Sequence, residues 1–363
     1  MPNLIPFQFV LAKYGIPAEE AEITPVSSGL IHRTWKVGQG GRQFILQQVN
    51  HQVFKDPEGL AHNVSVIGQY LKTHNPAYFF VSQLSDVDGR AVVQDQEGMY
   101  FRLFPYVEGS RTFSTAPTPE HAFEAAFQFG RFARLLSGFD PSHLHIGIPN
   151  FHNLAARYRH WQDILRHGNK ERIKQSRAWI AKCRDHQDIV DTYNHLVKDP
   201  QVIQRVTHHD TKISNVLFDA DGKGICVIDL DTVMPGYFIS DVGDMMRTYL
   251  SPAGEEEREL DGVVVREEYF KAIIQGYLDN MGDKLTPVEQ GLLFYAGRFM
   301  LFMQGLRFLT DYCQDDTYYG AAYPEQNFYR AHNQFCLLEK LEEKKSVLMP
   351  IIAAALKSYY PLS

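Results

Sequence analysis

Short apolar runs separated by turn residues dominate the N-terminal part of the chain. Runs rich in β-branched and aromatic residues occupy residues 34–37, 44–49, 91–94 and 100–104. A Gly-Gln-Gly-Gly turn over residues 38–41 joins the first two runs, since glycine readily adopts the positive φ angles that tight turns need. A helical pattern near residues 60–71 ends before Pro76, because proline disfavours helix at the residue that precedes it. We therefore expect a small antiparallel sheet with one helix packed against it.

The periodicity of the apolar positions changes after this predicted sheet. Thr118 and Pro119 are residue types favoured at a helix start, and apolar residues then recur at three- and four-residue steps until Gly138. Thr286 and Glu289 form a predicted capping box at the start of a long helix. Further helices are predicted near residues 152–168, 170–198, 265–281 and 332–345. The rest of the chain is therefore predicted to be mainly helical, and the whole fold to be α+β.

The length and composition of the chain narrow the class of protein. Its 363 residues are more than twice a typical domain of about 150, so we expect two lobes with a cleft between them. A net charge of -7 argues against non-specific nucleic-acid binding but allows a local basic pocket for a phosphorylated ligand. The 4 cysteines form no C-x-x-C pair, which argues against a zinc site or a disulfide framework. No apolar run approaches the roughly 20 residues that cross a bilayer, and no basic segment marks a secretion signal. We expect a cytoplasmic enzyme that binds neither nucleic acid nor membrane.

Oxygen-bearing side chains flank a predicted hairpin in the C-terminal part. Two brief apolar runs, residues 216–218 and 225–228, are separated by residues that suit a tight turn. Asp210 and Asn215 precede the first run, and Asp229 follows the second. Folding of the hairpin would bring these three side chains to the same end of the ribbon.

Such a group of side chains suits a magnesium-dependent phosphoryl transfer. Mg²⁺ prefers carboxylate and amide oxygens, keeps several waters and takes further ligands from substrate phosphates. In phosphoryl transfer the protein mainly positions the groups, and one aspartate orients or deprotonates the attacking hydroxyl. We assign Asp210 as this catalytic base, with Asn215 and Asp229 as ligands of Mg²⁺. Asp231 either binds a second Mg²⁺ or accepts bonds from N–H groups of its own loop.

The spacing of these residues resembles a known superfamily. His208-x-Asp210-x4-Asn215, followed by Ile-Asp-Leu-Asp over residues 228–231, is similar to the catalytic and metal-binding loops of the small-molecule branch of the protein-kinase-like fold. Aminoglycoside phosphotransferases, choline kinases and homoserine kinases belong to this branch. The chain resembles the bacterial N-acetylhexosamine 1-kinases more closely, through residues 28–34, 227–236, 241–244 and 305–312. The resemblance therefore spans most of the chain.

The resemblance implies a two-lobed organisation that agrees with the apolar pattern. It implies a strand-rich N-lobe over residues 1–104, a hinge over residues 105–110 and a helical C-lobe over residues 111–363. His208 and Asp241 would act as structural anchors that hold the catalytic loop through backbone groups.

The resemblance also implies a site for ATP between the lobes. The adenine would bond to the backbone of the hinge at Pro105, Tyr106 and Val107, and a loop containing Ser28 and Gly29 would cover the phosphates.

One position departs from the pattern of kinases. The third strand of kinases carries a lysine that binds the nucleotide phosphates, and here Gln47 and Gln48 stand where that lysine would be expected. Either Arg33, Lys36 or Lys55 supplies the missing cation, or nucleotide binding depends on Mg²⁺, or the protein is a degenerate kinase. We retain Gln47 as a nucleotide-binding residue.

The acceptor side is indicated by three further residues. Arg307 lies on the apolar stripe of a predicted helix, and a buried charge needs a partner. That partner is either Asp311, one turn later, or a hydroxyl or phosphate of the substrate. By resemblance to the hexosamine kinases, Arg307, His32 and Tyr318 would contact the sugar.

These observations predict an ATP- and Mg²⁺-dependent kinase that phosphorylates the anomeric hydroxyl of a hexose, an N-acetylhexosamine by resemblance. A first alternative is a kinase of choline, an aminoglycoside or homoserine, for which Asp311, Asp315 and Asp316 could form an acidic cage. A second is a nucleotide-binding pseudokinase. A third is a zinc or two-metal hydrolase built on His208 and His209 with neighbouring aspartates.

Overall fold

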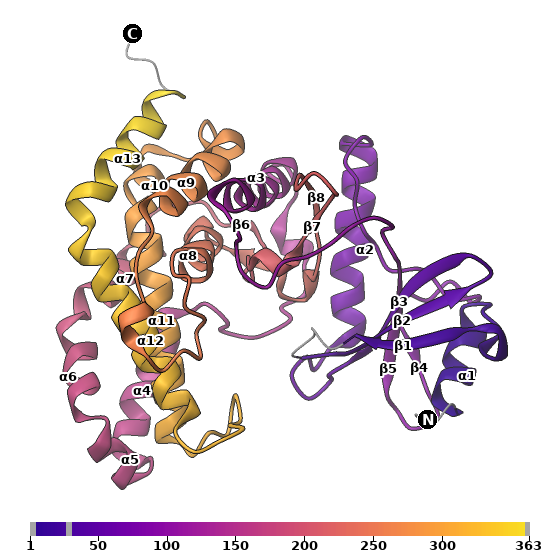
Figure 1. Ribbon diagram of the computed structural model, residues 1–363, viewed down its shortest axis with the longest axis horizontal. Helices are drawn as coiled ribbons and strands as arrows, with labels where there is room; N and C mark the ends of the chain where they lie inside the picture. Colours follow the sequence, from indigo (N-terminus) through magenta and orange to yellow (C-terminus); the bar gives the residue numbers. More distant parts are fainter. Residues whose placement is uncertain (1–4, 27–30, 360–363) are drawn as a thin grey trace.

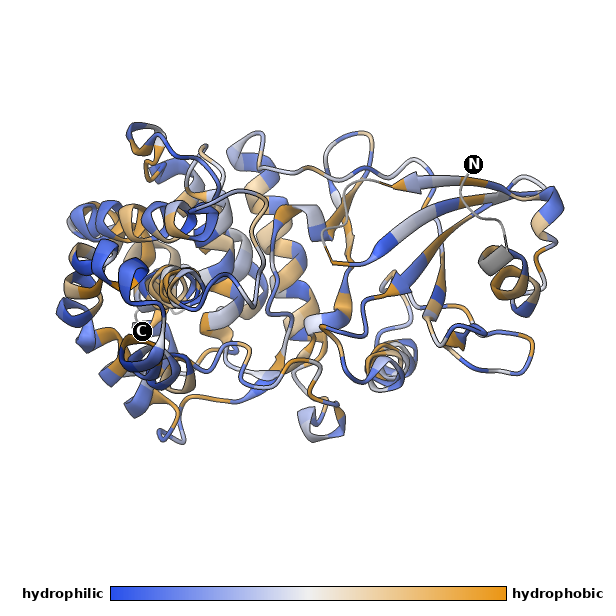
Figure 2. Ribbon diagram, turned by 90° about the horizontal axis from the view of Figure 1, so that it is seen from below, coloured by the Kyte–Doolittle hydropathy of each residue, from blue (hydrophilic) through white to orange (hydrophobic). Residues whose placement is uncertain are grey.

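The protein has the α+β architecture that the sequence predicts, in a computed structural model that describes residues 5–26 and 31–359. The elements from α1 to β5, which we call the sheet part, lie at one end of the long axis (Figures 1 and 2). The elements from α3 onward, which we call the helical part, lie at the other end. Helix α2 (Pro57–His74) stands on the side of the sheet that faces the helical part (Figure 1). None of the described helices is long and apolar enough to cross a membrane.

The sheet part contains a five-stranded antiparallel sheet in the order β1-β2-β3-β5-β4. Its strands are β1 (Glu22–Val26), β2 (Arg33–Gln39), β3 (Arg42–Val49), β4 (Val93–Gln94) and β5 (Tyr100–Pro105). Helix α1 (Ile5–Lys13) packs on this sheet, where its Val10 and Leu11 share a buried cluster with Leu46 and Phe101. The helix and the sheet therefore enclose a small core of their own.

The observed strands match the predicted runs with one addition. Strand β1 is not among the predicted runs, because its residues are exposed or half-buried and Pro25 interrupts the β-branched pattern. The predicted run over residues 91–94 is shorter in the structure, where only Val93 and Gln94 pair with β5.

The helical part is organised around one buried helix. Its helices are α3 (Pro119–Leu135), α4 (Leu154–His167), α5 (Lys170–Gln175), α6 (Arg177–Asp185), α7 (Gln187–Leu196), α8 (Phe238–Tyr249), α9 (Glu267–Met281), α10 (Pro287–Gly291), α11 (Leu293–Cys313), α12 (Gln326–Glu343) and α13 (Lys345–Lys357). Helices α4, α8 and α12 pack around α11, and α3 packs on α9. Every residue of α11 except Arg298 is buried. Four short strands, β6 (Arg205–Thr207), β7 (Val216–Phe218), β8 (Gly224–Val227) and β9 (Met234–Gly236), form the pairs β6-β9 and β7-β8.

The capping box is present, but the helix that it opens is short. Thr286 Oγ1 accepts a bond from Glu289 N at 3.1 Å, and Glu289 Oε2 accepts one from Thr286 N at 3.0 Å. Helix α10 ends at Gly291, and Leu292, at φ -94° and ψ 1°, separates it from α11. The single long helix predicted here is therefore wrong. The predicted helix over residues 170–198 is likewise divided, into α5, α6 and α7.

Replacing Glu289 by glutamine is expected to lower the free energy of unfolding by about 3–5 kcal/mol, the range for removing one partner of a buried ion pair. Glu289 is fully buried and accepts bonds from Arg205 Nη1 at 2.9 Å and Nη2 at 3.1 Å, so its loss leaves the guanidinium without a counter-charge. Chemical denaturation monitored by circular dichroism measures the change. Glu97→Gln, at an exposed turn, is the control and should stay within about 0.5 kcal/mol of the wild type. Equal unfolding midpoints for the two variants would contradict the prediction.

Candidate active site

The β7–β8 hairpin brings together the three residues that the sequence selects. Asn215 comes directly before β7 and Asp229 comes two residues after β8, and Ile228 N donates to Asn215 O at 2.9 Å. Asp210 joins them from the preceding loop. Asn215 Nδ2 donates to the backbone oxygen of Asp210 at 2.9 Å and to its Oδ2 at 3.1 Å. The predicted hairpin is therefore present, and its open end carries oxygen atoms from separate segments.

Negative charge is concentrated at this end of the hairpin. Asp229 is exposed to the cleft, although protein surrounds its carboxyl on the other sides. This enclosure, together with Asp231 and Asp210, raises the pKa of Asp229 to about 6. Lys212 Nζ lies 3.2 Å from Asp210 Oδ2, a contact that the sequence analysis did not anticipate. Because Arg102 pairs with Asp231, Lys212 is left to balance both Asp210 and Asp229, and the arrangement suits an additional cation.

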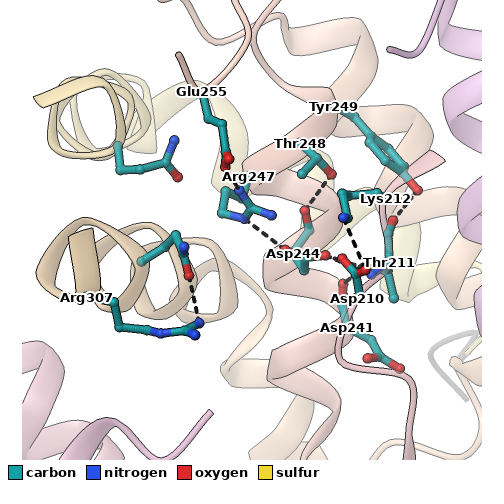
Figure 3. A network of polar contacts seen from close by, with 12 residues as sticks. Asp210, Thr211, Lys212, Asp241, Asp244, Arg247, Thr248, Tyr249, Glu255 and Arg307 are labelled. Atoms are coloured by element: carbon teal, nitrogen blue, oxygen red, sulfur yellow. Dashed lines mark hydrogen bonds and ion pairs between the residues drawn. The ribbon is translucent and has the colours of Figure 1, made fainter. Parts of the chain in front are cut away.

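Backbone contacts hold the loop that carries Asp210 (Figure 3). Asp241, in α8, accepts bonds from His208 N at 3.1 Å and from His209 N at 2.8 Å. Asp244 Oδ2 accepts a third bond from Thr211 N at 2.7 Å, and Figure 3 shows these acidic side chains beside the loop. Burial raises the pKa of Asp241 to about 7, against the lowering effect of its two N–H donors. These are the contacts expected of a residue that anchors a loop.

The rings of the two histidines in this loop point to backbone oxygens. His208 Nδ1 accepts from Asp210 N at 3.4 Å, so its Nε2 donates to Ile228 O at 3.1 Å. His209 Nδ1 lies 3.1 Å from the carbonyl oxygens of Thr207 and Thr232. Burial lowers the pKa of His209 to about 4, so its ring is neutral at pH 7. In the part of the chain that the structure describes, no three His, Cys, Asp or Glu side chains form a group that could hold a metal. The hydrolase alternative would need these rings as metal ligands, and their nitrogens contact backbone groups instead.

A cavity of about 320 Å³ separates the sheet part from the hairpin. Pro105, Tyr106 and Val107 line one side, and Gln47 also faces the cavity. From the hairpin side it is lined by Asn215, Asp229 and Asp231. Ser28 and Gly29 lie outside the described residues. A larger, more open hollow of about 680 Å³ lies between α9 and α13, and none of the candidate residues lines it.

Asp231 forms an ion pair across the cavity that the sequence analysis missed. Both Nη atoms of Arg102, in β5, donate to the carboxylate of Asp231, with Nη2 at 2.6 Å from Oδ2. His32 Nδ1 accepts from Asn50 N at 3.0 Å, so its Nε2 donates to Asp231 Oδ2 at 2.6 Å. Burial alone would raise the pKa of Asp231, but Arg102 and His32 outweigh it and hold that pKa well below its usual range. Neither role predicted for Asp231 describes these contacts, because its partners are two side chains of the sheet part. The predicted contact of His32 with a sugar is also corrected, because both of its ring nitrogens are already hydrogen-bonded.

The guanidinium of Arg307 points toward the side on which the Asp210 loop lies (Figure 3). Only 7% of Arg307 is exposed, and its Nη1 donates to Gln304 Oε1 at 2.9 Å. Its Nε has no hydrogen-bond partner among the described residues. Asp311 is not its partner, because Asp311 accepts bonds from Tyr318 N at 2.7 Å and Tyr319 N at 2.9 Å. Within residues 5–26 and 31–359, Arg307 is therefore a buried cation with no carboxylate partner.

A sequence match over most of the chain identifies its family. Residues 22–281, which include the sheet and the hairpin with its flanking loops, match the phosphotransferase enzyme family. The chain belongs to this family. As a phosphotransferase, it transfers a phosphoryl group, which agrees with the chemistry of the assembled oxygens.

Solved structures with low sequence identity share the fold of this phosphotransferase. A microcompartment-associated aminopropanol kinase matches with a TM-score of 0.63 and 16% identity, over 95% of this chain and 98% of that chain. An aminoglycoside phosphotransferase from Alicyclobacillus acidocaldarius matches with a TM-score of 0.62 and 15% identity, over 96% of both chains. An amicoumacin kinase in complex with AMP-PNP and Ca²⁺ matches with a TM-score of 0.60 and 13% identity, over 95% of this chain and 94% of that chain. The protein-kinase-like fold is therefore confirmed, and these likenesses extend to the fold alone.

Proposed function

We propose that this phosphotransferase is an ATP- and Mg²⁺-dependent kinase that phosphorylates the anomeric hydroxyl of a hexose, namely an N-acetylhexosamine. The observation that carries the proposal is the direct contact of Asp210 with Asn215 at the hairpin end that also holds Asp229. ATP occupies the cavity between the sheet part and the hairpin, with its adenine along residues 105–107. The resemblance of the sequence motifs to bacterial N-acetylhexosamine 1-kinases supports the choice of acceptor.

The residues at the hairpin end fit Mg²⁺. The amide nitrogen of Asn215 is used by Asp210, which leaves its Oδ1 as the oxygen that it can offer to a cation. Burial and the neighbouring carboxylates Asp231 and Asp210 raise the pKa of Asp229, and a cation beside it would favour its charged form. With so few protein ligands, the remaining positions belong to water and nucleotide phosphates, as is usual for Mg²⁺. The ion supplies neutralisation of the charge on the transferred phosphoryl group.

Asp210 orients the sugar hydroxyl and accepts its proton. Its carboxylate is fixed by Asn215 Nδ2 at 3.1 Å and by Lys212 Nζ at 3.2 Å, so it is held before the acceptor arrives. The Asp241 contacts position the backbone of the same loop. Pre-positioning of this kind lowers the entropic cost of the attack.

The acceptor side favours a neutral or anionic molecule over a cation. The acidic cage required by choline or an aminoglycoside depends on three aspartates that have other partners. Asp311 binds backbone N–H groups, Asp315 accepts a bond from Asn169 Nδ2 at 2.8 Å, and Asp316 pairs with Arg172 at 2.6 Å. Burial and the neighbouring charge of Arg307 lower the pKa of Arg157, which indicates that two cations face the same pocket. Guanidinium groups bind sugar hydroxyls and phosphates well, and repel ammonium groups.

The proposal is tested by measuring ADP release with Mg·ATP and a panel of acceptors. Release that depends on an N-acetylhexosamine, with sugar 1-phosphate detected by ³¹P NMR, is the expected result. Release that depends on choline, an aminoglycoside or homoserine would transfer the assignment to that acceptor class. If Mg·ATP changes neither the melting temperature nor ADP production with any acceptor, the pseudokinase alternative is favoured.

Replacing Arg307 by glutamine is expected to raise the KM for the sugar by about 10- to 100-fold, the effect of losing a hydrogen bond to a charged group. Its guanidinium faces the acceptor space, so the affinity for ADP should remain within about two-fold of the wild type. Arg298→Gln is the matched control, because Arg298 lies on the same helix but pairs with Asp188 and Glu342. Steady-state kinetics and calorimetry separate the two effects. A sugar KM that is unchanged in Arg307→Gln would remove this residue from the acceptor site.

A further inference from the structure

The cavity assigned to ATP has an unbalanced charge. Among its described lining residues, Asp229 and Asp231 carry negative charge and Arg102 is the single basic residue. The triphosphate of ATP would bring several further negative charges next to these carboxylates. One Mg²⁺ offsets only part of this charge, so a protein cation close to the phosphates would stabilise the bound nucleotide.

The three cations considered from the sequence do not fill this role. Lys36 Nζ lies 4.0 Å from the centre of the Tyr106 ring, where it makes a cation–π contact. Arg33 and Lys55 are exposed, and neither lines the cavity. Neither β2 nor the loop after β3 therefore supplies a cation in place of the lysine that kinases carry on the third strand.

Arg102 occupies the position on the sheet that the missing lysine would reach. Strands β3 and β5 pair so that Gln47 lies directly opposite Arg102. Directly opposite residues project from the same face with Cβ atoms about 5 Å apart. Arg102 Nε donates to Gln47 Oε1 at 3.1 Å, which draws the guanidinium to the place where a third-strand side chain would end.

The guanidinium keeps hydrogen-bonding capacity in this position. Arginine has five N–H donors, and the structure uses three of them: Nε for Gln47, and one each from Nη1 and Nη2 for Asp231. Two N–H groups have no hydrogen-bond partner within residues 5–26 and 31–359. Only 2% of Arg102 and 2% of Asp231 are exposed, so protein packs closely around the pair, and Arg102 is also a lining residue of the cavity.

We propose that Arg102 binds the nucleotide phosphates from β5, in place of the lysine that kinases carry on the third strand, and that Asp231 is the carboxylate that positions it. This inference rests on the proposed kinase function. Asp231 then acts through Arg102 rather than as a ligand of a second metal ion. Gln47 has the same orienting role from the neighbouring strand.

Calorimetric titration of adenosine and ADP in EDTA tests the proposal, since adenosine lacks the groups that Arg102 binds. The variant Arg102→Gln leaves a buried carboxylate unpaired and is at risk of unfolding. The double variant Arg102→Gln/Asp231→Asn removes both charges and is therefore the main test. We expect it to bind ADP about 10- to 100-fold more weakly than the wild type and to bind adenosine within two-fold of the wild type. Arg33→Gln is the matched control and should bind both ligands as the wild type does.

Asp231→Asn alone distinguishes positioning of Arg102 from metal binding. This variant keeps the guanidinium but removes a negative neighbour, so the gain in ADP affinity on adding Mg²⁺ should match that of the wild type. A loss of that gain would assign Asp231 to the metal and overturn its role as a positioning residue.

The remaining outcomes separate this inference from the function on which it rests. If the double variant binds ADP as tightly as the wild type, or loses adenosine binding to the same extent, Arg102 has no special role at the phosphates. If the wild type binds ADP neither in EDTA nor with Mg²⁺, both the kinase function and the role of Arg102 are overturned.

Discussion

Replacing Asp210 by asparagine is expected to lower kcat by about 10²- to 10⁴-fold, the range for loss of a general base. An amide of the same size keeps an oxygen for the bond from Asn215 Nδ2, which is 3.1 Å long in the wild type, but it does not accept the proton of the sugar hydroxyl. Asp210 does not line the nucleotide cavity. The Kd for Mg·ADP should therefore stay within about two-fold of the wild type.

The control for this variant is Asp221→Asn. Asp221 lies on the same hairpin, at the exposed turn between β7 and β8, so the change of charge is identical but remote from the acceptor. Initial-rate kinetics with saturating sugar and Mg·ATP measure both proteins. An Asp210→Asn enzyme with near-normal turnover, or a comparable loss in Asp221→Asn, would exclude Asp210 as the base.

The variant Asp229→Asn is expected to abolish the effect of Mg²⁺ on nucleotide binding and to lower turnover by about 10³-fold. Loss of a metal-mediated charge stabilisation of several kcal/mol corresponds to a rate factor of this order. Asparagine is the appropriate substitute because residue 229 has a φ of 60°, in the left-handed region that asparagine and aspartate tolerate better than other side chains. The backbone is therefore retained, and the effect reports the charge.

Titration of ADP with and without Mg²⁺ measures this effect in the absence of turnover. In the wild type Mg²⁺ should tighten binding, and in Asp229→Asn the two affinities should coincide. Circular dichroism checks that the fold is unchanged. Undiminished tightening by Mg²⁺ in the variant would show that Asp229 does not hold the ion.

The sequence predicted the hairpin end because its determinants are local. Asn215 and Asp229 lie next to the apolar runs that form β7 and β8, so the pairing of two short strands brings them together. The same holds for the capping box of Thr286 and Glu289, whose two hydrogen bonds join residues three positions apart. Short-range chemistry of this kind can be read without knowledge of the fold.

The cross-cavity ion pair could not be predicted in the same way. Arg102 and Asp231 are 129 residues apart, and His32 and Asp231 are 199 residues apart. Their contact depends on how the sheet part sits over the hairpin, which no periodicity encodes. One signal was present: Arg102 is the single charged residue in the otherwise apolar run over residues 100–104, and a buried charge in such a strand requires a partner.

The expectation that the acidic residues near Arg307 could form a cage for a cation failed for a related reason. Their number in the sequence suggested a cage for a cation, but Asp311 is used by the backbone N–H groups of Tyr318 and Tyr319. Composition shows how many carboxylates are present. It does not show which of them are hydrogen-bonded to the surrounding loop.

The burial of α11 constrains how acceptor preference can diverge among relatives. Arg307 belongs to a helix that is packed on all sides, so moving its guanidinium would disturb the packing of several other helices. Tyr318 lies in the segment that follows, and half of its surface is exposed. The α11 side of the acceptor site is thus fixed by packing, whereas the segment that carries Tyr318 can tolerate change. We expect new acceptor preferences to arise by replacement and length variation between α11 and α12.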